Sequence, residues 1–137
     1  TANPDQDLKP IRKVASGGEL SRISLAIQVA TSGSSEIPTL VFDEVDTGIG
    51  GPTAATVCRY LKTLAEHRQI LSITHLAQVA SGGDQHLFVG KQVTKGTTQT
   101  SLKSLNDEQR IEEIARMLGG ESVTENSRAH ARELLTA

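Results

Sequence analysis

The chain has very few aromatic residues. Phe42, Tyr60 and Phe88 are the only three among 137 residues, and tryptophan is absent. The core is therefore expected to be aliphatic, and a single-strand nucleic-acid platform that stacks bases on aromatic rings is not expected. The formal net charge of -2 provides no overall positive field for nucleic acid, so any contact with DNA would be local or lie outside this chain.

Cysteine and long apolar runs are also scarce. The single cysteine, Cys58, excludes an internal disulfide and a multi-cysteine metal site, and this usage is typical of a reducing compartment. No apolar stretch reaches the length of a membrane span and no signal peptide is visible, so we expect a cytoplasmic location without a membrane partner. The chain begins with Thr1 rather than methionine, which suggests a piece of a longer protein.

A phosphate-binding loop is missing as well. The pattern G-x-x-x-x-G-K-[ST] does not occur in the chain. The only Gly-Lys step is Gly90-Lys91, which is followed by Gln92, and Gln85 stands where the first glycine of the pattern would be. A nucleotide site built on this chain would lack its usual phosphate cradle.

Hydrophobic periodicity predicts one compact α/β unit covering residues 1–137, with a mainly parallel sheet flanked by helices. We expect the strand at 39–43 to be buried on both faces, and Leu20, Ile23 and Ile27 to form the apolar stripe of the first helix. In the first part of the chain we expect a helix after Ser16 that stops at Gly33, a strand at 39–43, a helix from Pro52 and a strand at 70–74. A short helix at 76–80 and an antiparallel hairpin of 86–93 and 99–105 around Lys95-Gly96 should follow. Helices at 107–118 and 124–135 should end the chain, the second of them begun by a capping pair of Ser122 and Glu125.

The segment Ser16-Gly17-Gly18-Glu19 supports two interpretations. In the first it is a capping box, in which Ser16 and Glu19 exchange hydrogen bonds at a helix start. That does not account for Gly17 and Gly18, because glycine is a poor helix former unless something approaches the backbone closely. In the second, the bare amides and positive end of the helix dipole bind an anion such as a phosphate. As an isolated motif, the segment does not decide between the two.

Two carboxylates and a histidine follow the predicted parallel strands. Asp43 and Glu44 lie at the carboxyl end of the first strand, where open α/β sheets place their ligand crevice. Asp43 is suited to Mg²⁺, directly or through water, and Glu44 to activating an attacking water. His75 follows the second strand and should emerge at the same sheet edge. The alternative is a pair of solvated carboxylates and a surface histidine.

Other classes of site fit the sequence less well. A serine hydrolase of Ser16, His75 and Asp43 lacks the G-x-S-x-G elbow, and a calcium site of Asp43, Glu44 and Asp46 lacks the EF-hand spacing. The remaining chemical groups are read as structural or solvated: Lys9, Arg12 and Lys13 as a solvated basic cluster, Cys58 as a buried inert thiol, and His67, His86 and His130 as surface or capping residues.

The order of the motifs is more informative than any one of them. ASGGE at 15–19, TLVFDE at 39–44 and SITH at 72–75 resemble the signature motif, Walker B motif and switch histidine of ABC-type ATPases. Within that superfamily, GGELSRISLAIQ, FDEVDTGIGGPTA, THLAQVA and IARMLGG are similar to bacterial SMC-like DNA repair ATPases. The resemblance covers nearly the whole chain.

This resemblance implies the carboxyl-terminal lobe of an ATPase head, with the phosphate loop in an amino-terminal half beyond a long coiled coil. Two heads would sandwich ATP and Mg²⁺. Residues Ser16, Gly17, Gly18 and Glu19 would contact the ATP held by the opposite head. On their own side, Asp43 would hold Mg²⁺, and Glu44 and His75 would be catalytic. The implied partners are the amino-terminal half of the head, a second head in an ATP-dependent homodimer, and DNA.

The implied function is ATP hydrolysis in recombinational repair of DNA double-strand breaks, near the nucleoid, with this chain inactive by itself. Two positions depart from the common pattern. Ala15 replaces a leucine, and Gly50 stands where many relatives carry the aspartate of the D-loop, which leaves Asp46 as a weaker D-loop candidate. The alternatives are another SMC-like or ABC ATPase head, or a non-catalytic scaffold that retains the fold.

Overall fold

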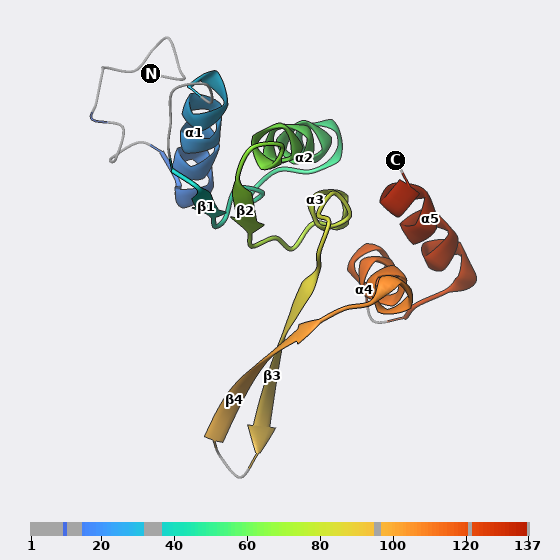
Figure 1. Ribbon diagram of the computed structural model, residues 1–137. Coiled ribbons are helices and arrows are strands. Elements are labelled where there is room, and N and C mark those ends of the chain that lie inside the picture. Colours follow the sequence, from blue (N-terminus) through green and yellow to red (C-terminus); the bar gives the residue numbers. More distant parts are fainter. Residues whose placement is uncertain (1–9, 11–14, 32–36, 95–96, 121, 137) are drawn as a thin grey trace. The chain divides into compact units, whose positions relative to one another are not determined.

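The computed structural model describes residues 10, 15–31, 37–94, 97–120 and 122–136 (Figure 1). The chain divides into two compact units, the first ending at Thr74 and the second beginning at His75, and each is described by itself. Within the described ranges, no helix has the length and apolar character needed to cross a membrane.

The first unit is built on a parallel strand pair. Strand β1 (Thr39–Phe42) pairs with β2 (Gln69–Ser72) in the register Thr39↔Gln69 to Phe42↔Ser72, and helix α2 (Gly51–Ala65) connects them. This confirms the predicted strand–helix–strand order, with a sheet of two strands in the described part. Helix α2 buries an apolar stripe at helical spacing: Ala54, Val57, Leu61 and Leu64. Cys58 is half-buried and not fully buried as predicted, because it lies at the edge of this stripe.

Helix α1 (Gly17–Ala30) confirms the helix predicted after Ser16, and its apolar stripe is exposed. Its buried residues are Gly18 and Leu25, whereas the predicted stripe of Leu20, Ile23 and Ile27 is exposed. The apolar spacing therefore predicted the helix correctly, and the stripe that it forms is uncovered in the described part of the chain. Gly33, the predicted stop, lies outside them.

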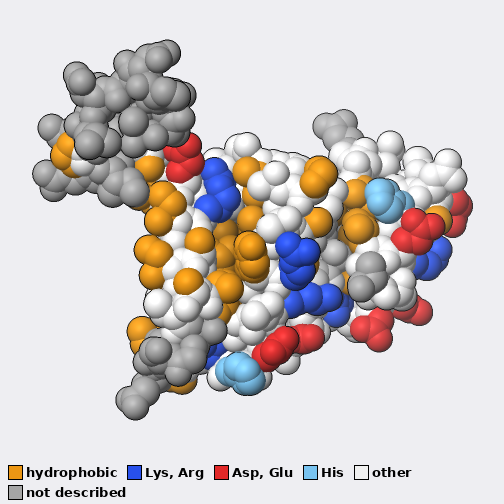
Figure 2. Space-filling model, turned by 90° about the horizontal axis from the view of Figure 1, so that it is seen from above, with side chains coloured by type: hydrophobic (Ala, Val, Ile, Leu, Met, Phe, Trp, Pro, Cys, Tyr) orange, Lys and Arg blue, Asp and Glu red, His pale blue; other side chains and the backbone are white. Residues whose placement is uncertain are grey.

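Strand β1 is also less buried than predicted. Only Phe42 is buried, and Val41 is 63% exposed. Leu71 and Ile73 of the β2 segment are exposed as well. Two strands with one crossover helix cannot cover both faces of a sheet, so burial on both faces was a wrong prediction for the described residues. Figure 2 shows uncovered hydrophobic side chains on the face that it presents.

The second unit contains the short helix α3 (Ala77–Ala80), a hairpin and two helices. Strands β3 (Leu87–Thr94) and β4 (Thr97–Ser104) pair antiparallel, with Val89 opposite Leu102, which confirms the predicted hairpin; its turn at Lys95-Gly96 lies outside the described residues. Helices α4 (Asp107–Gly119) and α5 (Glu125–Thr136) are also confirmed. The second core comprises Ala77, Ile114, Ala115 and Ala131.

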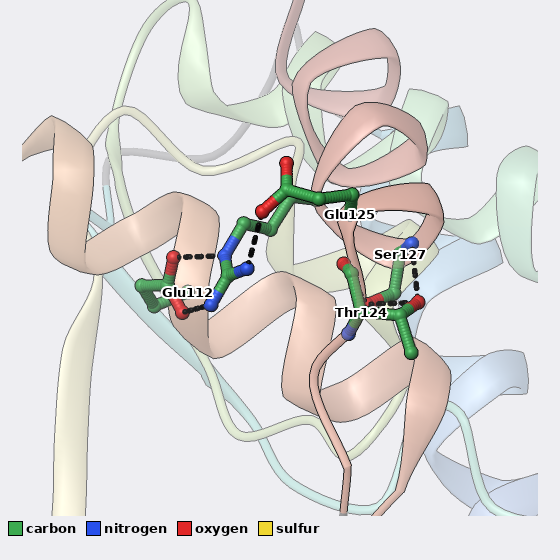
Figure 3. A network of polar contacts seen from close by, with 5 residues as sticks. Glu112, Thr124, Glu125 and Ser127 are labelled. Atoms are coloured by element: carbon green, nitrogen blue, oxygen red, sulfur yellow. Dashed lines mark hydrogen bonds and ion pairs between the residues drawn. The ribbon is translucent and has the colours of Figure 1, made fainter.

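The start of α5 differs from the prediction in its capping residues. Thr124 Oγ1 accepts from the Ser127 amide at 3.1 Å, and Ser127 Oγ accepts from the Thr124 amide at 2.9 Å. The pair of Ser122 and Glu125 was a wrong prediction, because Glu125 instead accepts from Arg128 at 2.6 Å. The Arg128 side chain also bonds Glu112 of α4, so that one guanidinium joins the two helices (Figure 3).

Candidate functional site

The capping box predicted at the start of α1 is present. The Ser16 amide donates to Glu19 Oε2 at 2.7 Å, and the Glu19 amide donates to Ser16 Oγ at 3.3 Å. The hydrogen bonds from the Ser16 amide and from its side chain hold the pKa of Glu19 below its ordinary value. The side chains of Ser16 and Glu19 are thus both engaged in the cap at the start of α1.

The two glycines after Ser16 lie against the residues that follow β1. A Cβ on Gly18 would come within 2.9 Å of the Thr47 carbonyl oxygen and 3.0 Å of the Glu44 carbonyl oxygen. A Cβ on Gly17 would clash with Glu44 Oε2. A close neighbour was expected at these two glycines. That neighbour is residues 43–50 of the same chain, called here the Glu44 loop.

The Glu44 loop holds its central residue in an unusual backbone conformation. Glu44 has φ +57°, the only positive φ of a non-glycine residue in the described part of the chain. Such a residue costs about 1–3 kcal/mol and persists only where its surroundings fix it. Val45 is fully buried directly after it, while the side chains of Asp43 and Glu44 are exposed. Val45 thus anchors the loop, and the carboxylates of Asp43 and Glu44 remain exposed.

Helix α1 binds the backbone of the Glu44 loop through two side chains that sequence reasoning missed. Ser21 Oγ donates to the Asp43 carbonyl at 2.6 Å. Arg22 Nη1 donates to the carbonyl oxygens of Val45 at 3.3 Å and Thr47 at 2.8 Å. Both residues lie three or four positions after Gly18 and therefore share its helix face. The sequence signal that could have identified these two donors is a serine and an arginine at helical spacing from a glycine.

Asp46 lies inside the first unit. It is 1% exposed and accepts a hydrogen bond from Thr74 Oγ1, just beyond β2. A buried carboxylate requires such partners, because its desolvation is costly. This hydrogen bond connects the Glu44 loop to the end of the neighbouring strand. The hydrogen bond favours a structural role for Asp46 over a role in contact with another subunit.

Gly50 and His75 occupy different settings. Gly50 has an extended backbone, with φ -169°, and a Cβ there would meet open space, so the structure itself does not require glycine. His75 is exposed at the start of the second unit, and its predicted place beside Glu44 stays a prediction.

The donor set of the Glu44 loop suits a magnesium nucleotide better than a protein-caged metal. No group of three His, Cys, Asp or Glu side chains that could hold a metal ion exists among the described residues. Mg²⁺ bound with a nucleotide characteristically takes one or two carboxylates together with phosphate oxygens and waters. The exposed carboxylate of Asp43 meets that requirement, and the amino end of α1 offers the amides and dipole that favour a phosphate.

Comparison with known proteins identifies relatives along the whole chain. It is 56% identical over 137 residues to the DNA repair protein RecN of Vibrio cholerae, covering 100% of the chain and 25% of that protein. It is 46% identical to RecN of Treponema pallidum over 100% of the chain, and 50% identical to RecN of Deinococcus radiodurans over 98%. The chain spans about a quarter of the length of these relatives. No protein-family model matches.

One solved structure shares the fold. It comes from work described as "Structural biochemistry of ATP-driven dimerization and DNA stimulated activation of SMC ATPases". The TM-score is 0.54 at 21% identity, over 86% of this chain and 70% of that one. The sequence relationship to RecN therefore extends from one end of the chain to the other, and the fold is similar to that of an SMC ATPase.

Proposed function

We propose that this chain, a RecN-type sequence over its whole length, forms the carboxyl-terminal lobe of an SMC-like ATPase head in a protein of recombinational DNA double-strand-break repair. The similarity to RecN proteins supports the repair role, and the fold shared with an SMC ATPase supports the head. The observation that carries the proposal is the packing of the amino end of α1 against the Glu44 loop. Two segments suited to nucleotide chemistry lie together in one unit.

The proposed roles follow from the chemistry of each group. The Ser16 hydroxyl, the amides of Gly17 and Gly18, and the capped start of the helix at Glu19 would contact ATP held by a second head. Glu44 would accept the proton of the attacking water, a role worth about 10²–10⁴ in rate. His75 would be the second catalytic residue, donating a hydrogen bond to the γ-phosphate or to the attacking water.

Asp43 would hold Mg²⁺, directly or through water, close to the Glu44 base. When bound with ATP, the ion neutralises charge on the phosphate oxygens during transfer. The contribution of the chain itself is to place an acceptor for the metal and an acceptor for the water proton on consecutive residues. Asp46 remains the weaker candidate for communication between heads, since its carboxylate is buried.

The uncovered apolar side chains support a partner that continues the same head. Exposed residues on α1 and along the parallel strands offer an aliphatic surface: Leu20, Ile23, Ile27, Val41, Leu71 and Ile73. Since the chain spans a quarter of its relatives, we propose that the amino-terminal half of the head, with its phosphate loop, covers this surface. The intact protein would act in the cytoplasm, on DNA near the nucleoid, and the chain alone would hydrolyse ATP negligibly.

The experiment is steady-state ATP turnover by the intact protein, with ATP-dependent pairing of heads followed by size-exclusion chromatography. Glu44→Gln should retain ATP binding, lose turnover and accumulate paired heads, because the carboxamide cannot accept the water proton. Unchanged turnover would remove Glu44 as the base, whereas absence of turnover in the wild-type protein would favour the non-catalytic scaffold.

A second variant separates the signature contact from chemistry. Ser16→Arg should leave ATP binding to each head intact but block pairing, because a bulky cation replaces the hydroxyl at the contact point. Wild-type pairing by this variant would contradict the role given to the amino end of α1.

A further inference from the structure

The Glu44 loop depends on donors from another element for its shape. Glu44 sits at positive φ, and the carbonyl groups around it at residues 43, 45 and 47 all accept hydrogen bonds from α1. A hydrogen-bonded turn within the loop, from the Thr47 amide to the Glu44 carbonyl at 3.1 Å, adds only a local restraint. Ser21 and Arg22 therefore supply long-range restraints on the backbone next to Glu44, in addition to the hydrogen bond between Asp46 and Thr74.

Arg22 is the more demanding of these two donors. Its guanidinium is planar, keeps its charge at any ordinary pH, and can satisfy two carbonyl oxygens at once with fixed geometry. The two acceptors, Val45 and Thr47, follow Glu44 on its carboxyl side, while the acceptor for Ser21 precedes it. The two side chains together fix the backbone on both sides of Glu44.

The same helix also limits where the Glu44 side chain lies. Gly17, at the start of α1, is directly beside Glu44 Oε2, and Gly18 allows the Glu44 carbonyl to approach. The positive end of the helix dipole favours a carboxylate at this place. Helix α1 therefore contacts the carboxylate of Glu44, the backbone carbonyl of Glu44 and the peptide groups on either side of this residue.

We propose that Arg22 is a positioning residue for Glu44, holding the Glu44 loop so that the carboxylate can meet the attacking water. This inference rests on the base role proposed above for Glu44. Arg22 makes its contacts to backbone carbonyl groups, so it acts through Glu44 and not on the nucleotide. Misplacement of a reacting group by about 1 Å costs on the order of 10²-fold in rate.

The test compares ATP turnover per bound ATP in the intact protein, together with KM and thermal unfolding. Arg22→Met keeps the aliphatic stem and removes the donors, so kcat should fall by about 10- to 100-fold with KM for ATP unchanged. Arg22→Lys keeps a charged donor but lacks the planar guanidinium and its fixed geometry, so it should recover part of the rate. Ser21→Ala provides a milder loss that tests the same loop if Arg22→Met does not fold. Arg59→Met, on the exposed side of α2, is the matched control and should keep wild-type kcat.

A double variant distinguishes positioning from a general structural role. In single-turnover assays, adding Arg22→Met to Glu44→Gln should slow the residual hydrolysis no further, because Arg22 acts through Glu44. A further loss equal to the one in the wild-type background would overturn the positioning role. Wild-type kcat in Arg22→Met, while Glu44→Gln is inactive, would overturn it as well. Wild-type turnover in Glu44→Gln would instead refute the role of Glu44 as the base, whatever the Arg22 variants show.

Discussion

The closeness of α1 and the Glu44 loop can be tested by adding one methyl group at either of two neighbouring glycines. In Gly18→Ala, the new Cβ would lie 2.9 Å from one backbone oxygen and 3.0 Å from another, where ordinary contacts begin at 3.4 Å. Backbone atoms cannot rotate away, so the helix and the loop must separate. Overpacking of this kind costs about 1–3 kcal/mol. The higher helix propensity of alanine offsets at most about 1 kcal/mol of that cost.

Gly17→Ala is the matched comparison. Its Cβ would meet only the end of the flexible Glu44 side chain, which can rotate away. The free energy of unfolding should therefore stay the same or rise by up to about 1 kcal/mol through helix propensity. The two substitutions are chemically identical and adjacent in sequence, so their difference reports the packing alone.

The assay is thermal unfolding of the intact variants, combined with amide hydrogen exchange of peptides that contain residues 43–49. Gly18→Ala should unfold at lower temperature and exchange faster in this loop, while Gly17→Ala should unfold at or above the wild-type temperature and exchange no faster than the wild type. Equal behaviour of the two variants, or a Gly18→Ala protein as stable and as protected as the wild type, would refute the packing described here.

Two further predictions concern backbone conformation and pH. Gly50→Asp should leave the unfolding temperature unchanged, because Gly50 is extended and open. Gly51→Ala should cost roughly 1–2 kcal/mol, because Gly51 has φ +51° and alanine carries a Cβ; similar effects of the two substitutions would contradict this. Burial holds the pKa of His86 below its ordinary value of 6.5, so the unfolded chain takes up a proton more readily and the free energy of unfolding should decrease as pH falls through 6.5. Unfolding of His86→Asn between pH 5.5 and 7.5 should lack this part of the pH dependence, and a slope equal to that of the wild type would contradict the prediction.

Local signals predicted the elements of this chain well. Ser16 and Glu19 form the expected capping box, and the apolar residues of α2 fall on its buried face. The alternation around Val89 and Leu102 identified the hairpin. These features depend on residues that are close together in the sequence or that recur with the period of one helix. The amino-acid sequence therefore contains the information needed to predict them.

The errors concern what covers each face. Val41 and Ile23 have the residue type and spacing of core positions, but periodicity cannot state whether the covering layer belongs to the same segment. At α5, Thr124 and Ser127 exchange the capping hydrogen bonds, while Glu125 pairs with Arg128 of the same helix. Arg128 also bonds Glu112 of α4, a contact between helices that the sequence pattern does not contain.

For the candidate site, the sequence located the two segments but not the contact between them. It indicated that Gly17 and Gly18 meet a close neighbour, without identifying the Glu44 loop as that neighbour. Arg22 was overlooked because its acceptors, the carbonyls of Val45 and Thr47, are backbone groups that every residue carries.

This kind of acceptor has an evolutionary consequence. Ser21 and Arg22 recognise the path of the loop and not the identity of its side chains, so an exposed residue such as Thr47 could be exchanged without a compensating change in the helix. Statistical coupling between positions, which reports side chains that change together, would then give no sign of this contact. The shape of the Glu44 loop would be inherited through the helix, while an exposed residue such as Thr47 changed in the course of evolution.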